Sequence, residues 1–201
     1  SYFKKCINLL DFVSVREEQV STTLNNLCNS SIKTVVDPTL LLDANDYSNL
    51  LSDSCEKEGY VFAYFVHEDN ILMECAQKIA SQLGKKLIEL HYYLQKNLKG
   101  HNQRADFGPS EFLTYIKNAD FVLTNSFHGT VFSVLYGKNF YSIYNNDSRK
   151  DNLLNNLKLK SRHIYSVDGI ELNQEIDYES VYELLRWYRK SSIDFLDKAL
   201  S

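Results

Sequence analysis

The sequence has little of what marks linkers, membrane segments or nucleic-acid-binding surfaces. Its 201 residues include only two prolines and seven glycines, whereas 44% are hydrophobic and 13% are aromatic. This composition is typical of a folded globular chain that buries a sizeable core. The formal net charge is −4, and a chain without a basic field does not recruit nucleic acid or an anionic membrane surface. We therefore expect no nucleic-acid partner.

Long apolar runs are also missing. No stretch approaches the roughly eighteen residues that a membrane-spanning helix needs, and no signal-peptide pattern is visible. We therefore expect a cytoplasmic protein without a transmembrane segment. The sequence has no initiating methionine, and its first ten residues resemble the end of a helix. That beginning indicates a trimmed chain.

Metal-binding and dinucleotide-binding patterns are absent as well. The four cysteines form no CxxC pair and have no histidine at metal-ligand spacing: they are Cys6, Cys28, Cys55 and Cys75. Scattered thiols in an α/β chain are most simply reduced and structural. No GxGxxG follows the first expected strand of the main sheet, which argues against a bound dinucleotide. We expect neither a metal nor a cofactor.

The densest pattern that is present runs from Gly108 to Ile143. A helix opened by a Gly-Pro pair precedes Ala119–Leu123, an apolar run that is typical of a parallel strand covered on both faces. A second helix is expected to begin near His128 and to end at Gly137. The intervening turn, Thr124–Thr130, would lie at the carboxyl end of a strand and the amino end of a helix. Such a position favours an anionic ligand.

Hydrophobic periodicity predicts further elements on both sides of this segment. Strands are expected at 12–15, 33–36, 60–66, 86–90 and 140–143, and helices at 17–27, 47–51, 70–83, 151–159 and 178–200. The helix at 17–27 should carry Val20, Leu24 and Leu27 on its apolar face. Residues 43–59 are typical of a linker, and residues 91–107 of an irregular loop. The strand-helix-strand order at 60–90 predicts a doubly wound α/β fold with a parallel sheet.

Four sequence segments resemble one known family. The segment NADFVLTNSFHGTVFSVLYGKNFYSI is similar to the signature of the polysaccharide pyruvyl transferase family, in its Ser-Phe-His-Gly version. Three other segments fit the family in the same order: FVSVREEQ at 12–19, VVDPTLLL at 35–42 and DSRKDNLLNNLKL at 147–159. Each segment is moderately specific, and together they cover most of residues 12–159.

The resemblance implies an architecture similar to GT-B glycosyltransferases, with two Rossmann-like halves facing each other across a cleft. Residues 1–50 would then be a remnant of, or return segment to, an amino-terminal Rossmann-like domain that is mostly missing. Residues 51–201 would form the carboxyl-terminal Rossmann-like domain with its terminal helices. The implied reaction moves the enolpyruvyl part of phosphoenolpyruvate, the donor substrate, onto a sugar of a polysaccharide precursor as a cyclic ketal.

The resemblance also implies roles for particular residues. His128 is expected to be the catalytic acid and base, because imidazole titrates near neutral pH. Phosphate and carboxylate would be bound by side chains and N–H groups around it: Arg16, Asn125, Ser126, Gly129, Thr130 and Arg149. Many family members have arginine where this chain has Ser126. No metal is required by this scheme.

Each of these residues also has a plain structural interpretation. Arg16 can pair with Glu17, Glu18 or Asp37, and Asp37 is expected to hold the turn before Pro38 or to pair with Arg16. His128 can be a hydrogen-bonding residue at a helix start. Arg149, expected on the loop after a strand, can be a surface residue. His67 is expected to be an ordinary loop residue at the same edge of the sheet.

Two other classes of function remain open. A GT-B glycosyltransferase would use the same edge of the sheet for a nucleotide sugar, with Glu111 and His128 serving the donor ribose and phosphates. A non-catalytic relative would bind sugar without turnover. The aromatic stripe of the last helices, at 178–200, is expected to be a packing face, part of which is available for self-association as a homo-oligomer.

Overall fold

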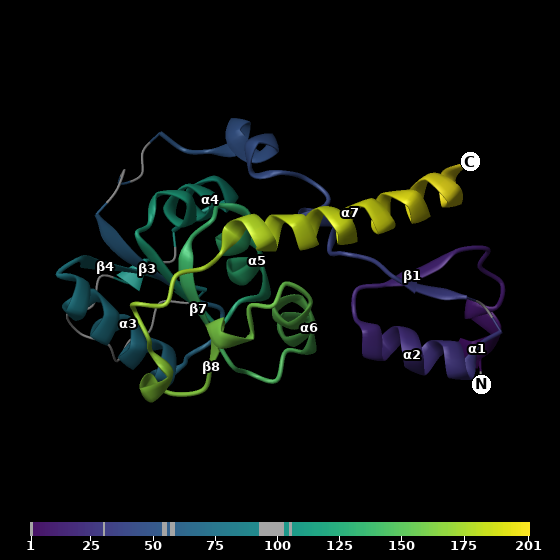
Figure 1. The fold of residues 1–201 in the computed structure, drawn as a ribbon, viewed down its shortest axis with the longest axis horizontal. Coiled ribbons are helices and arrows are strands. Elements are labelled where there is room, and N and C mark those ends of the chain that lie inside the picture. Colours follow the sequence, from purple (N-terminus) through teal and green to yellow (C-terminus); the bar gives the residue numbers. More distant parts are fainter. Residues whose placement is uncertain (1, 30, 54–55, 57–58, 93–102, 105) are drawn as a thin grey trace.

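The computed structural model describes residues 2–29, 31–53, 56, 59–92, 103–104 and 106–201. It contains a small βαβ unit near the amino terminus and a larger α/β unit, with a long carboxyl-terminal helix running between them (Figure 1). The small unit comprises α1 (Tyr2–Ile7), β1 (Val13–Val15), α2 (Glu18–Leu27) and β2 (Ile32–Thr34). Two 3₁₀ helices, η1 (Pro38–Leu40) and η2 (Ala44–Leu50), lead into the larger unit.

In the small unit, β1 and β2 pair in parallel and α2 packs against them. The expected apolar face of α2 is partly wrong, because Val20 and Leu27 are exposed. The buried side is set instead by Ser21, whose hydroxyl donates to the carbonyl of Ile32 at 2.9 Å. Asn25 forms two hydrogen bonds with the same residue. Its side-chain carbonyl accepts the N–H of Ile32 at 2.8 Å, and its side-chain amide donates to the carbonyl of Ile32 at 3.0 Å. These polar contacts fix the rotation of the helix.

The larger unit alternates strands and helices along most of its length. Its strands are β3 (Tyr60–Phe65), β4 (Lys86–His91), β5 (Gln103–Arg104), β6 (Phe121–Thr124), β7 (Asn139–Ile143) and β8 (His163–Ile164). Its helices are α3 (Asn70–Leu83), α4 (Pro109–Asn118), α5 (Phe127–Leu135), α6 (Ser148–Asn156), η3 (Lys160–Arg162), η4 (Val167–Gly169) and α7 (Tyr178–Leu200).

The six strands form one parallel sheet in the order β5-β4-β3-β6-β7-β8. The chain steps outward from β3 to β5, returns to β6 beside β3, and continues outward to β8. This is the order of a Rossmann-like doubly wound sheet, which confirms the predicted α/β class. The strand order reverses between β3 and β6, and the carboxyl ends of these two strands therefore flank a crevice.

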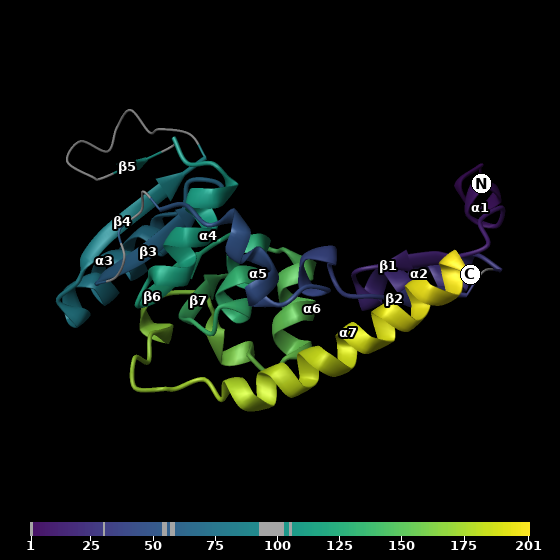
Figure 2. The ribbon, with the colours of Figure 1, turned by 90° about the horizontal axis from the view of Figure 1, so that it is seen from above.

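Helices cover both faces of the sheet (Figures 1 and 2). On one face α3 buries Leu72, Cys75 and Ile79 against β3, β6 and β7. On the other face α4, α5, α6 and α7 pack with η1 and η2 in a second core. The boundaries of α3 were predicted correctly, and Gly84 ends this helix with a φ of +61°.

Two predictions about the larger unit are wrong, and one strand was missed. Residues 103–104, expected within an irregular loop, pair with β4 as β5; residues 93–102 and 105 of that loop lie outside the described part. The two-residue strand β8 was not predicted, because it is too short to show periodicity. Helix α6 begins at Ser148, earlier than expected, because the Asp147 carboxylate caps it and accepts the N–H of Arg149 at 3.1 Å. Arg149 therefore lies in the first turn of a helix.

Helix α7 is a single helix of 23 residues that runs from the larger unit to the small one (Figure 2). The hydroxyl of Ser192 accepts the N–H of Val36 at 3.0 Å, and Arg189 donates to the carbonyl of Leu40 at 2.7 Å. Near its end the ring of Phe195 meets Phe12 edge-on. No helix in the described residues is both long enough and apolar enough to cross a membrane.

Candidate active site

The turn between β6 and α5 lies at the crevice where the strand order reverses. Ser126 caps α5, since its hydroxyl oxygen accepts the N–H of Gly129 at 3.2 Å. The hydroxyl of Thr124 accepts the N–H of Ser126 at 3.0 Å, and Thr130 donates its N–H and its hydroxyl to the carbonyl of Ser126 at 3.1 and 3.0 Å. The groups predicted to bind phosphate therefore form hydrogen bonds within the helix cap. They belong to Ser126, Gly129 and Thr130.

Close packing explains the glycine in this turn. A Cβ atom at Gly129 would lie 2.4 Å from the hydroxyl oxygen of Thr124 and 2.9 Å from its Cβ. Real Cβ atoms do not approach other atoms so closely, and Thr124 is fully buried. Gly129 therefore lets the first turn of α5 rest directly on the end of β6.

Asn125 braces the ends of several elements and is itself buried. Its side-chain carbonyl accepts the N–H of Val66 at 2.9 Å, and its amide donates to the carbonyl of His67 at 3.0 Å. Its main-chain carbonyl accepts hydrogen bonds from Asn145 at 2.9 Å and from Lys150 at 3.2 Å. Asn125, which the resemblance implies binds substrate, thus ties the ends of β3 and β6 to the start of α6.

Lys150 is a buried cation that sequence reasoning missed. Its side chain is inaccessible to solvent, and its ammonium group donates to the carbonyls of Ile143 at 2.6 Å and Asn125 at 3.2 Å. Burial lowers its pKa to about 8, although nearby carboxylates oppose this shift. A signal was available, because Lys150 lies on the same helical face as the buried Leu153, Leu154 and Leu157.

His128 faces a buried carboxylate from a distant part of the sequence. Its Nε2 atom lies 3.9 Å from Oδ1 of Asp37, and its side chain is 49% exposed whereas that of Asp37 is 3% exposed. Asp37 caps η1 by accepting the N–H and the hydroxyl of Thr39 at 3.0 and 2.6 Å, and it pairs with Arg16. Burial acts to raise the pKa of Asp37, but the hydrogen bonds from Thr39 and Arg16 outweigh it and the net shift is downward.

Two arginines flank the aromatic ring next to His128. The guanidinium carbon of Arg149 lies 5.1 Å from the ring centre of Phe127, and that of Arg16 lies 6.0 Å from it. Arg149 also donates to both carboxylate oxygens of Asp147, at 2.9 and 2.7 Å. The hydrogen bond with Asp147 raises the pKa of Arg149. Both arginines are about 40% exposed and keep part of each guanidinium open to a ligand.

His128 and Ser126 stand between two hollows. The polar hollow, of about 620 Å³, is lined by His67, Asn125, Asn145 and residues 146–149, among others. The aromatic hollow, of about 560 Å³, lies on the other side. It is lined mainly by rings: Tyr47, Tyr64, Tyr92, Phe107, Phe112 and Phe132. The half-exposed imidazole is therefore reachable from both hollows.

Glu111 does not join this group. Its carboxylate accepts the N–H of Gly108 at 3.0 Å and caps α4, and it lines neither hollow. His67, expected to be a loop residue, follows β3 and lines the polar hollow. Across the described ranges, His, Cys, Asp and Glu side chains do not gather in threes as a metal site would require.

Comparison with known proteins adds a family relationship. A family model described as "Polysaccharide pyruvyl transferase" matches residues 1–148, which is more than half of the chain. The matched part contains Arg16, Asp37 and His128, and it ends one residue before Arg149. A search of curated proteins found no match.

Proposed function

The chain belongs to the polysaccharide pyruvyl transferase family, whose members are transferases, and from this premise we propose a specific reaction. The enzyme moves the pyruvyl group of phosphoenolpyruvate to two hydroxyls of a sugar in a surface-polysaccharide or exopolysaccharide precursor, and a cyclic ketal results. The observation that carries the proposal is the position of His128. Its imidazole lies between two hollows, 3.9 Å from the buried carboxylate of Asp37.

The proposed chemistry needs one group that both takes up and releases protons. The first sugar hydroxyl bonds to C2 of phosphoenolpyruvate and loses its proton while C3 gains one, so the C=C double bond becomes a methyl group. The C2–O bond to phosphate then breaks, and phosphate leaves with the electron pair. The second hydroxyl bonds to C2, and its proton ends on phosphate. In this scheme, His128 carries the first hydroxyl proton to C3.

Charged neighbours support this role. The carboxylate of Asp37 lies 3.9 Å from the imidazole of His128, and the net downward shift of its own pKa keeps it ionised near neutral pH. Arg149 and Arg16 are the cations available for the phosphate and carboxylate of the donor. They would supply the charge that an arginine at the position of Ser126 would bring in the family members that have one. The polar hollow, which Arg149 lines, is our proposed donor site.

We also propose that the larger unit is one half of a GT-B-like arrangement. The parallel β1-α2-β2 unit has the connectivity of a Rossmann-like repeat, and α7 contacts it from the larger unit. Arg16 and Asp37 reach the site from this side of the molecule. Residues of both units would then form the two walls of the cleft.

Ligand-dependent stabilisation tests the choice of donor. We expect phosphoenolpyruvate at 100 times its dissociation constant to stabilise the chain by about 2.7 kcal/mol, measured as a rise in melting temperature. Arg149→Gln should reduce this stabilisation. Asn155→Ala, a substitution at an exposed residue of the same helix, should leave it unchanged. A shift caused only by nucleotide sugars would contradict the proposal and favour a glycosyltransferase.

A further inference from the structure

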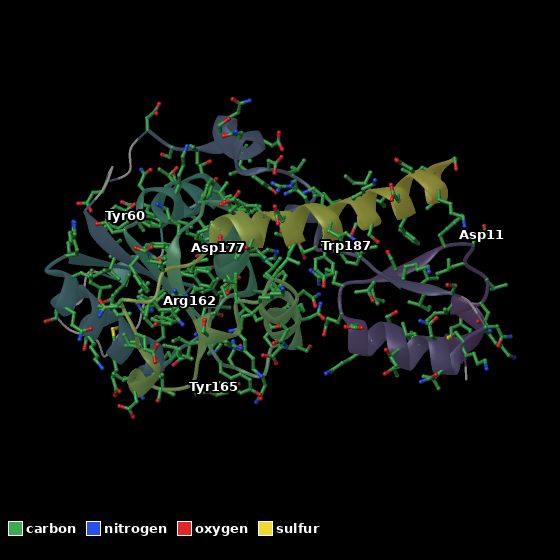
Figure 3. The ribbon with its side chains drawn as sticks, viewed as in Figure 1. Asp11, Tyr60, Arg162, Tyr165, Asp177 and Trp187 are labelled. Atoms are coloured by element: carbon green, nitrogen blue, oxygen red, sulfur yellow. The ribbon has the colours of Figure 1, made fainter. Side chains whose placement is uncertain are left out.

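A third pocket lies between the two units. We call it the interunit pocket, and its volume is about 300 Å³. Its walls come from the end of β2, from α6 and from the middle of α7, where Figure 3 labels Trp187. Its polar and aromatic lining residues include Arg16, Glu18, Phe127, Arg149, Asn152, Asn156, Trp187, Tyr188 and Ser191.

One wall of the interunit pocket is aromatic and open. Trp187 is the only tryptophan of the chain and is 65% exposed. Its ring meets Tyr188 edge-on, with the ring centres 4.8 Å apart. An exposed indole beside a pocket offers a flat apolar surface together with an N–H donor.

The other walls carry polar groups that are available to a ligand. The side chains of Glu18, Asn156 and Ser191 form no hydrogen bond with any other residue that the structure describes. Asn152 donates to the carbonyl of Arg16 at 3.3 Å, which leaves its side-chain carbonyl as an acceptor. Beside Arg16 and Arg149, the pocket thus offers both hydrogen-bond donors and acceptors, a set that suits a molecule rich in hydroxyl groups.

The interunit pocket is continuous with the site around His128. Phe127 and Arg149 line both this pocket and the polar hollow. Asp37 also lines the interunit pocket, while its carboxylate lies 3.9 Å from the imidazole of His128. A molecule bound beside Trp187 would therefore lie next to the proposed donor site.

We propose that the interunit pocket binds the acceptor sugar, an inference that rests on the proposed function. A pyranose ring has an apolar C–H face that packs on an indole, and hydroxyls that each need a donor and an acceptor. Trp187 provides the surface for the apolar face. Hydrogen-bonding groups for the hydroxyls come from the side chains of Glu18, Asn156 and Ser191. A volume of about 300 Å³ is at the small end of ligand sites, so the pocket holds a terminal sugar residue and the rest of the precursor extends outside.

The single tryptophan makes this inference directly testable. Methyl glycosides of glucose, galactose, mannose and N-acetylglucosamine would each be titrated into the full chain without phosphoenolpyruvate, while the emission of Trp187 is recorded. At least one should give a saturable change in the millimolar range. Asn156→Ala should weaken that binding about tenfold, the equivalent of about 1.4 kcal/mol for a lost hydrogen bond. Asn155→Ala, its exposed neighbour, should leave binding unchanged.

The outcomes separate this inference from the proposed reaction. If a sugar binds and Asn156→Ala weakens it, the pocket is a sugar site even when phosphoenolpyruvate is never turned over. If no glycoside gives a saturable change in Trp187 emission, the inference is overturned, whether or not pyruvyl transfer is observed. Binding that Asn155→Ala and Asn156→Ala weaken equally also overturns it.

Discussion

At the scale of single residues, Gly129 gives the sharpest expectation for stability. In Gly129→Ala the new methyl group would overlap buried Thr124, and overpacking of this kind costs about 1–3 kcal/mol. Urea unfolding should show this loss. Combining the change with Thr124→Ala should cost less than the sum of the two single changes, because the truncated side chain gives way. Additive losses would show that the contact at this turn is not the cause.

Lys150 should make stability depend on alkaline pH in a defined direction. Its folded-state pKa of about 8 lies below the ordinary value of 10.5, so between these values the unfolded chain binds more protons than the folded one. Stability contributed by this residue should therefore rise with pH across that window, by at most about 3 kcal/mol. Comparing unfolding of the wild type with Lys150→Met at pH 8 and pH 10 measures the effect. A constant difference between the two proteins would contradict it.

At the scale of elements, α7 should hold the segment before η2 in place through Arg189. This side chain donates to the carbonyls of Leu40 and Leu42 at 2.7 and 2.9 Å and to Asp43 at 2.5 Å. Arg189→Ala should destabilise the chain by about 1.5–3 kcal/mol and speed hydrogen exchange in residues 37–43. Arg186→Ala, an exposed change on the same helix, serves as the control. Equal exchange in both variants would show that Arg189 does not hold this segment.

The elements also show what periodicity can predict. Helix α3 and the strands β3 and β4 were predicted closely, because each is long enough to show its apolar pattern and α3 ends at a glycine. The pattern failed for α2, because hydrogen bonds from the polar side chains of Ser21 and Asn25 determine which side of the helix is buried. It also failed for β5 and β8, which are short strands formed by pairing at the two edges of the sheet.

At the scale of the whole molecule, the sequence predicted the position of the turn at 124–130 better than the contacts within it. The turn at 124–130 joins the carboxyl end of β6 to the amino end of α5, as its flanking pattern indicated, and the Arg16–Asp37 pair is one of the three pairings expected for Arg16. Glu111 caps α4 through Gly108, only three positions before it, whereas the use of Asn125 as a brace depends on neighbours far away in the sequence. The same holds for the approach of Asp37 to His128, which are 91 positions apart by their numbers.

The most direct test of the proposed function is release of phosphate from phosphoenolpyruvate in the presence of an acceptor glycoside, with ¹³C NMR of the product. A ketal carbon should appear in the sugar product, with one phosphate released per ketal formed. His128→Gln should lower the rate by about 10²–10⁴-fold, while Asn155→Ala leaves it unchanged. Ketal formation at the full rate in His128→Gln would contradict the role of this residue. Glycosyl transfer without any ketal would contradict the reaction itself.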